Sequence, residues 1–254
     1  MTRSTRSGGL MVVLVVTAKN IPAKAELIAG LQKAVPGLES LCLSINSKRT
    51  NVILGTEIHT LWGKDVMEDT LGGLTFSVSP LSFFQVNPEQ TEKLYQLALD
   101  YAQLTGSETV VDAYCGAGTI SLLLAKNARK VIGIEIVPEA IQTANENAQR
   151  NGVKNAEFIV GASEEVLPEL VAKGLAPDGI VVDPPRKGCE EPVLQAIIKA
   201  QPRRVVYVSC GAPTLARDAK LLTEGGYKAT AVQCVDMFCW TGAVETVMLF
   251  TKEN

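Results

Sequence analysis

From residue 88 to the end of the chain, short apolar segments alternate regularly with longer amphipathic segments. Strands are expected at 109–112, 130–136, 156–160, 179–182, 203–208, 228–235 and 244–251, and helices at 89–104, 119–126, 138–151, 164–173, 191–200 and 214–224. Strands that alternate with helices form a mostly parallel, doubly wound α/β sheet. Because no helix separates the last two strands, we expect them to form an antiparallel hairpin at one edge.

The first third of the chain has a different pattern. Strands are expected at 10–17, 38–46, 51–54 and 74–79, one helix is expected at 23–35, and the polar residues 1–9 read as a frayed end. We therefore divide the chain into a small α+β subdomain, 1–87, followed by a larger α/β domain, 88–254.

Composition excludes several classes of protein. The apolar content of 46% and charged content of 20% are those of a soluble globular protein, and the apolar run Leu10–Val16 is too short to span a bilayer. This run is interpreted as a strand rather than a signal peptide, so we expect a cytoplasmic protein with no membrane contact. The six cysteines form no C-x-x-C pair, which argues against a metal cluster, and the single histidine, His59, argues against a histidine triad.

A glycine loop follows the first strand of the larger domain. Asp112 ends that strand and is followed by Gly116 and Gly118, which allow a tight turn and the close approach of a ligand. Glu135 ends the next strand, where an acid can accept hydrogen bonds from both hydroxyls of a ribose. The third glycine of a dinucleotide motif is missing, so S-adenosylmethionine is favoured over NAD.

Three further segments carry reactive groups. Asp183 leaves a strand through a rigid Pro-Pro pair, and ligands bind at the carboxyl ends of parallel strands. Arg186 occupies the position where adenine amino methyltransferases carry an aromatic residue, which argues against that chemistry. Cys210 ends the following strand before a helix; that helix and Arg217 are expected to lower the pKa of the thiol. Together with Cys210, Glu245 is a candidate base.

This set of motifs resembles the RNA uracil-5 (5-methyluridine) methyltransferases, especially the bacterial ribosomal RNA branch. The similarity runs from about Leu10 to the C-terminus. It is carried by the segments 82–87, 112–119, 183–189, 208–210, 214–218, 236–238 and 244–245.

The resemblance implies a Rossmann-like class I methyltransferase fold and a role for each matched residue. Cys210 matches the nucleophile, which adds to carbon 6 of uracil so that carbon 5 can attack the methyl sulfonium. Glu245 matches the base that then removes the proton of carbon 5. Phe83 matches an aromatic residue near the uracil, and the basic Arg186 is placed with it on the substrate side. The matched S-adenosylmethionine positions are Gln85, Tyr114, Glu135 and Asp183, and Gly116 and Gly118 of the glycine loop are expected to bind the same cofactor.

The sequence also departs from this family. It has no counterpart of the N-terminal β-barrel that binds RNA or of the iron–sulfur cysteines that many members carry, so it resembles the C-terminal, catalytic part. The family pattern is also changed at Ala162, Gly211, Cys239 and Ala243. The expected partner is RNA, ribosomal rather than transfer RNA. Two alternatives are a non-catalytic cofactor- or RNA-binding fragment and a methyltransferase that acts on another base or a small molecule.

Overall fold

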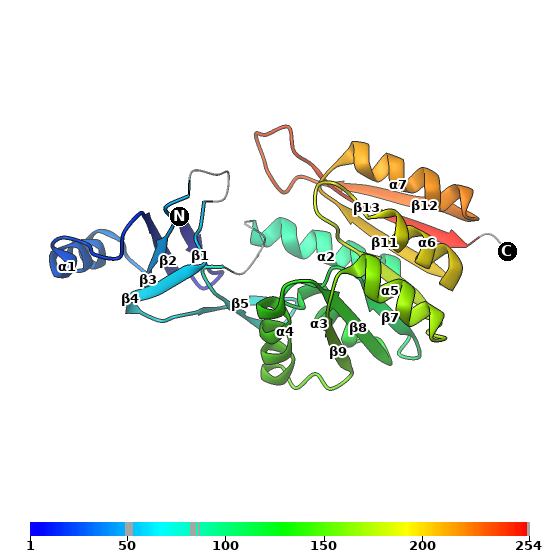
Figure 1. The fold of residues 1–254 in the computed structure, drawn as a ribbon, viewed down its shortest axis with the longest axis horizontal. Coiled ribbons are helices and arrows are strands. Elements are labelled where there is room, and N and C mark those ends of the chain that lie inside the picture. The colour runs from blue at the N-terminus through cyan, green and yellow to red at the C-terminus, as the bar shows by residue number, and fades with distance from the viewer. Residues whose placement is uncertain (49–52, 82–84, 86, 253–254) are drawn as a thin grey trace. The chain divides into compact units, whose positions relative to one another are not determined.

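The computed structural model describes residues 1–48, 53–81, 85 and 87–252 (Figure 1). The chain divides into two compact units, Met1–Phe84 and Gln85–Asn254. The division falls just before the expected boundary between residues 87 and 88.

The first unit contains a four-stranded sheet of order β1-β2-β3-β4 and a separate hairpin, β5-β6. Its elements are β1 (Thr2–Ser4), β2 (Leu10–Val16), α1 (Lys24–Ala34), β3 (Leu38–Ile45), β4 (Glu57–Gly63), β5 (Met67–Leu71) and β6 (Leu74–Val78). Strands β2 and β3 are parallel and are joined by α1. Met11, Val13, Cys42 and Met67 form the buried core of this unit.

Three expectations for the first unit were wrong. Residues 2–4, expected to fray, pair with β2, and the sequence pattern did not reveal β4 or β5. Residues 53–54 are not in a strand, and 51–52 lie outside the described residues. The strands β4 and β5 are polar at many positions, so their extended form depends on pairing with β3 and β6 rather than on local propensity.

The second unit is a seven-stranded sheet of order β12-β13-β11-β10-β7-β8-β9. Its strands are β7 (Thr109–Asp112), β8 (Lys130–Glu135), β9 (Ala156–Val160), β10 (Gly179–Val182), β11 (Arg204–Ser209), β12 (Tyr227–Val235) and β13 (Glu245–Lys252). The first five run parallel to one another, whereas β13 runs antiparallel to both β11 and β12. The expected doubly wound sheet with an antiparallel C-terminal hairpin is confirmed.

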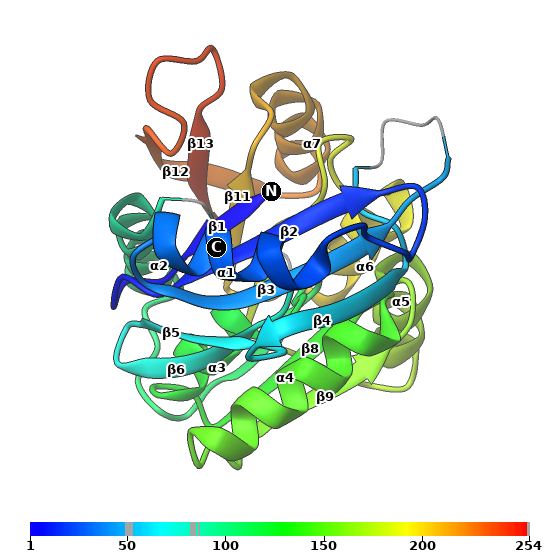
Figure 2. The same cartoon turned by 90° about the vertical axis from the view of Figure 1, so that its left-hand side faces the viewer.

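Helices cover both faces of this sheet (Figures 1 and 2). They are α2 (Pro88–Ala102), α3 (Thr119–Ala125), α4 (Pro138–Arg150), α5 (Ser163–Ala172), α6 (Glu191–Ala200) and α7 (Ala212–Glu224). Apolar side chains of α5, α6 and α7 form a continuous core with those of the central strands. Among the described residues, every helix is too short or too polar to span a bilayer.

The topology determines where a ligand can bind. From β7 the strand order continues through β8 and β9 in one direction and through β10 and β11 in the other. In open α/β sheets ligands bind outside the carboxyl ends of the strands at such a switch point, so we expect the ligand site between the loops that follow β7 and β10.

Candidate active site

The expected reactive residues gather at the carboxyl edge of the seven-stranded sheet. Asp112 ends β7, Glu135 ends β8, Asp183 follows β10 and Cys210 follows β11. Glu245 begins β13, which is antiparallel, so this residue reaches the same edge from the other direction.

The glycine loop after β7 is held by backbone and side-chain hydrogen bonds. Gly116 and Gly118 have φ values of 52° and 81°, a region that favours glycine. The amide of Gly116 donates to Oε2 of Glu135 at 3.2 Å, and Asn147 of α4 donates to the carbonyl of Ala117 at 3.1 Å. A Cβ at Gly118 would lie 3.0 Å from that of Ala144. The loop therefore needs glycine both for its conformation and for its close packing.

Glu135 is positioned by the loop that it also stabilises. Besides accepting from Gly116, it accepts the amide of Val137 at 2.9 Å through Oε1. Each carboxylate oxygen has a second lone pair. This geometry leaves Glu135 able to accept hydrogen bonds from the two hydroxyls of a ribose.

Asp112 places a buried acid beneath the same loop. Its Oδ2 accepts a hydrogen bond from Ser121 of α3 at 2.6 Å, whereas its Oδ1 is buried without a partner among the described residues. Burial raises the pKa of Asp112 to about 6, although the Ser121 hydrogen bond opposes this effect. A buried acceptor without a partner costs free energy, so Asp112 favours a ligand that donates a hydrogen bond or carries positive charge.

The segment 183–189 is fastened to α7 by a buried hydrogen-bond network. Asp218 of α7 accepts the amide of Cys189 at 2.8 Å and the hydroxyl of Tyr207 at 2.6 Å through Oδ2, and Nε of Arg217 at 2.7 Å through Oδ1. Gly188 has a φ of 80°, and a Cβ there would lie 2.6 Å from both Arg217 and Asp218. These contacts hold the loop that carries Asp183 and Arg186.

Sheet pairing brings Cys210 and Glu245 together. Ser209 of β11 pairs with Thr246 of β13, and the register places the next residues, Cys210 and Glu245, opposite each other. Glu245 is 4% exposed, whereas Cys210 is partly exposed. The two residues, far apart in sequence, are therefore neighbours, and Cys210 is the more exposed of the two.

The electrostatics of Cys210 differ from the expectation. Burial raises the pKa of the thiol, and the charges of Glu245 and Asp183 raise it further. Arg217 was expected to lower it, but Arg217 instead bonds Asp218 and the carbonyls of Lys187 and Cys189. That expectation was wrong. The side chain that favours the thiolate is Arg186, which also lowers the pKa of Glu245 against the dominant effect of burial.

Asp183 has the most perturbed carboxyl group of the site. Burial raises the pKa of Asp183 to about 8, and repulsion by Glu245 and Asp112 adds to the effect. Asp183, Glu245 and Asp112 lie close enough to repel one another electrostatically, so each carboxylate disfavours the ionised form of Asp183 or of its neighbours. The site therefore favours a cationic ligand, which would relieve this repulsion.

Tyr95 of α2 belongs to this site and was missed by the sequence analysis. Its side chain is 6% exposed, and the Gln85 side chain forms a hydrogen bond with it. Burial, followed by the charges of Asp183 and Asp112, raises its pKa. In the sequence, Tyr95 lies on the buried face of α2 with Leu94 and Ala98, where it is indistinguishable from core packing. Gln85 is thus placed near the expected cofactor site through Tyr95.

Tyr114 lies between Asp112 and the two glycines of the loop. Its side chain packs against the buried core of the second unit, and its hydroxyl is buried without a partner among the described residues. Phe83 lies outside the described residues.

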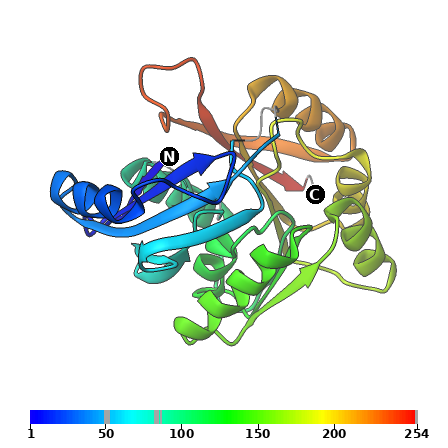
Figure 3. The same ribbon diagram turned by 60° about the vertical axis from the view of Figure 1, so that its left-hand side comes forward.

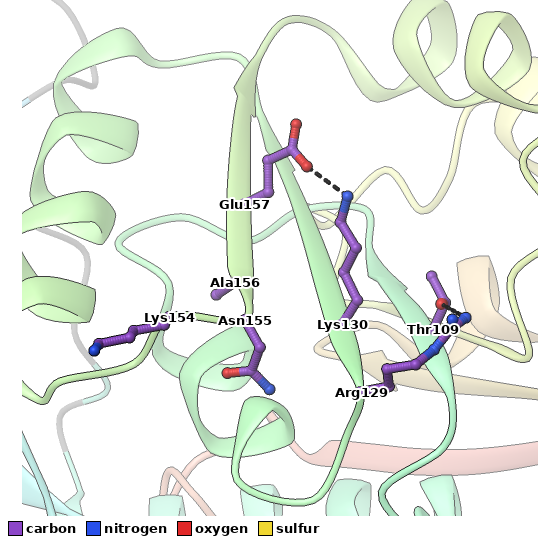
Figure 4. Close-up of a pocket in the computed structure, with 7 residues that line it drawn as sticks. All are labelled: Thr109, Arg129, Lys130, Lys154, Asn155, Ala156 and Glu157. Carbon is purple, nitrogen blue, oxygen red and sulfur yellow. Dashed lines mark hydrogen bonds and ion pairs between the residues drawn. The ribbon is translucent and has the colours of Figure 1, made fainter.

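A separate basic hollow of about 510 Å³ lies at the opposite, amino-terminal edge of the strands (Figure 4). Lys130 forms an ion pair with Glu157 at 2.7 Å, and Arg129 donates to Thr109 at 2.8 Å. This basic hollow contains none of the residues expected to react.

Within the described residues, no group of three His, Cys, Asp or Glu side chains is placed to hold a metal ion.

Comparison with known proteins identifies the family of the chain. The family model for tRNA (Uracil-5-)-methyltransferase matches residues 72–253. An uncharacterized RNA methyltransferase of Clostridium acetobutylicum is 53% identical over 250 residues, and one of Halalkalibacterium halodurans is 52% identical over 248 residues. Each match covers 98% of this chain but only 54% of the relative, so the chain spans about half the length of these relatives.

Solved structures show the same fold. The tRNA (uracil-54, C5)-methyltransferase of Pyrococcus abyssi, solved with S-adenosyl-L-homocysteine, superimposes with a TM-score of 0.81 at 28% identity, over 98% of this chain and 58% of that one. The tRNA m1G37 methyltransferase of M. jannaschii, at a TM-score of 0.63 and 15% identity over 100% of this chain and 75% of that one, shares the fold alone. From its sequence and its fold, the chain belongs to the tRNA (Uracil-5-)-methyltransferase family.

Proposed function

We propose that this chain is the catalytic part of an S-adenosylmethionine-dependent enzyme that methylates carbon 5 of a uridine in RNA. The observation that carries the proposal is the juxtaposition of Cys210 and Glu245 across β11 and β13, at the sheet edge that also holds Asp183. A nucleophile beside a base is the pair of groups that covalent catalysis on a pyrimidine requires.

The residues present fit S-adenosylmethionine. The glycine loop leaves room for close approach, and Glu135 retains lone pairs for a ribose. The partnerless Oδ1 of Asp112 and the raised pKa of Asp183 both favour a ligand with positive charge. A sulfonium cofactor has that charge and, because it lacks a pyrophosphate, does not need the complete dinucleotide motif. Gln85, Tyr114, Gly116, Gly118, Glu135 and Asp183 are accordingly assigned to cofactor binding.

The reaction follows from the positions of the two reactive side chains. The thiolate of Cys210 forms a bond to carbon 6 of uracil, and the displaced electron pair moves to the oxygen on carbon 4. The cofactor supplies an activated methyl group, to which carbon 5 forms a bond as S-adenosylhomocysteine leaves. Glu245 then takes the proton of carbon 5, the bond between carbon 6 and Cys210 breaks, and the ring double bond is restored.

Arg186 and the positively charged sulfonium of a bound cofactor have the same effect on the ionisation of Cys210 and Glu245 in this scheme. In the free chain, burial and two carboxyl groups hold the pKa of Cys210 above its ordinary value. A positive charge within about 4–6 Å favours an ionised thiol or carboxyl group. Arg186, assigned to the substrate side, and the cofactor therefore both promote the ionised forms that the reaction uses.

The test combines three substitutions with one RNA substrate. RNA that carries tritium on carbon 5 of uridine releases the label only when that proton is removed. Glu245→Gln is expected to accumulate a covalent protein–RNA adduct, seen as a shifted band on a denaturing gel, because the proton of carbon 5 remains. Glu157→Gln, on β9, is the control and should turn over normally. Tritium release by Cys210→Ala would contradict the proposal.

The finer target of the enzyme is also a proposal. Similarity of the motifs to the ribosomal branch favours ribosomal RNA, whereas the similar P. abyssi structure is named for a transfer RNA position. Mass spectrometry of both RNA classes, from cells with and without the gene, distinguishes them through the loss of 5-methyluridine. A cytoplasmic location is proposed with this assignment.

A second candidate is a cofactor-binding or RNA-binding part that has no activity alone. It is favoured by one observation, the coverage of only 54% of the C. acetobutylicum relative. Calorimetry with S-adenosylmethionine and the tritium assay separate the two candidates. Cofactor binding without release of label would support the second one.

A further inference from the structure

The loop that joins β12 to β13 has a fixed base. Met237 is 2% exposed, and its carbonyl accepts a hydrogen bond from Nδ2 of Asn87 at 3.3 Å. Asn87 is the N-cap of α2, and Thr91 of the same helix contacts the sulfur of Met237 at 3.8 Å. The loop therefore leaves the sheet from a position that α2 defines.

The tip of this loop exposes an indole ring. Trp240 is 103% exposed, the largest value among the exposed apolar side chains of the described residues. The loop projects beyond the ends of β12 and β13 in all three views (Figures 1, 2 and 3). A fully exposed Trp gains nothing from folding, because burial of apolar surface is what stabilises such a side chain.

The backbone holds the ring in this position at an energetic cost. Trp240 has a φ of 68°, which is rare for a bulky residue. The turn around it is closed by Thr241, whose amide and hydroxyl both donate to the carbonyl of Phe238, at 3.1 and 2.7 Å. The amide of Ala243 donates to the same hydroxyl at 3.1 Å. Strained backbone that its surroundings hold in place is a feature of binding sites.

The position of the loop connects this ring with the reaction. Trp240 precedes Glu245 by five residues, which limits their separation to roughly 18 Å. Arg186, exposed and electrostatically coupled to Glu245, adds positive charge to the same edge of the sheet. An aromatic face and a cation close to a uracil site are the two groups that bind an unpaired nucleotide, one through the base and the other through the phosphate.

We propose that Trp240 is a stacking platform for an unpaired base that flanks the target uridine. The proposal rests on the proposed function, since RNA is the partner that the reaction requires. A flat ring held in solvent suits a base, which offers a π face whatever its sequence. Trp240 thus contributes to RNA affinity and takes no part in the chemical step.

Three substitutions separate stacking from general apolar contact. Trp240→Leu keeps an apolar side chain without a ring and should weaken the binding of a single-stranded, uridine-containing RNA by about 5- to 150-fold. Trp240→Phe keeps a ring and should lose less. Trp240→Ala should match Trp240→Leu. An unchanged dissociation constant in Trp240→Leu overturns the proposal, as does an equal loss in the Phe and Leu variants.

Fluorescence gives an independent reading, because the chain has only one other tryptophan, Trp62. In a Trp62→Phe background the emission comes from Trp240 alone, and stacking on a base should quench it. Saturating single-stranded RNA should quench this emission more than an RNA duplex does. Emission that RNA leaves unchanged, or a wild-type chain that binds no RNA, overturns the proposal.

The two proposals fail in different ways. If Cys210→Ala remains active while RNA quenches Trp240, the catalytic assignment fails and the stacking platform stands. If Trp240→Leu methylates RNA with an unchanged KM while Cys210→Ala is inactive, the platform fails and the catalytic assignment stands.

Discussion

Replacement of Asp183 by Asn should stabilise the free protein, and increasingly so as the pH rises. In the folded chain burial and the charges of Glu245 and Asp112 raise the pKa of Asp183 to about 8, whereas an exposed Asp has a pKa of about 3.9. Between these two values the folded state binds the proton more tightly than the unfolded state does. The free energy of unfolding of the wild type therefore falls as the pH rises through this window.

The size of the effect follows from the same numbers. Each pH unit of the window corresponds to about 1.4 kcal/mol, so the whole window has an upper limit of about 6 kcal/mol. Asp183 is partly exposed, and water that reaches its carboxyl group reduces the penalty. We expect Asp183→Asn to exceed the wild type by about 2 kcal/mol at pH 8.5 and to differ little from it at pH 4.

Urea denaturation at several pH values measures this difference. Hydrogen–deuterium exchange of peptides from β10 and β11 restricts the measurement to the seven-stranded sheet. Asp218→Asn is the matched control, because Asp218 is buried but bonded to Arg217, Tyr207 and the amide of Cys189. The Asp218→Asn protein should be less stable than the wild type by about 3 kcal/mol, because loss of the carboxylate leaves buried partners unsatisfied. An Asp183→Asn difference that stays constant or shrinks with rising pH would refute the reasoning.

Three other substitutions test the reactive centre and its supports. Cys210→Ala should abolish tritium release and leave S-adenosylmethionine binding unchanged in calorimetry, whereas Cys234→Ala, an exposed cysteine, should retain activity. Gly118→Ala should weaken cofactor binding at least tenfold, because its φ of 81° and its contacts at 3.0–3.2 Å leave no place for a methyl group without movement of the loop; an unchanged calorimetric titration would refute this. Gly188→Ala should lower kcat and reduce the free energy of unfolding by about 2 kcal/mol, because the new Cβ would lie 2.6 Å from side chains of α7. Steady-state assays and urea denaturation measure these two quantities, and wild-type values of both would show that the loop relaxes.

Much of the fold follows from local pattern. The β-branched runs that became β7, β8, β10 and β11 are short and apolar, and the intervening segments are long enough for helices, so a parallel sheet could be derived without coordinates. The polar strands β4 and β5 could not be found in this way, since their extended form depends on partners elsewhere in the chain.

The candidate site was likewise predictable from the sequence only where it depends on local conformation. Gly116 and Gly118 could be recognised from sequence because local conformation demands glycine there, and Cys210 stood out by its place at the end of a strand. Whether Cys210 faces Glu245 depends on the register between β11 and β13, a long-range property of the sheet.

Sequence alone determined the order of strands and helices in the second unit, the glycine loop and the residue types available for reaction, because each of these depends on near neighbours in the chain. Tertiary structure alone decided the charge environment. In the folded chain Arg217 bonds Asp218 rather than the thiol, and the charge of Arg186 acts on Cys210. Tyr95 lies within electrostatic reach of the acids of the site. Electrostatic energies depend on separation in space and on burial, and neither of these can be read from position along the chain.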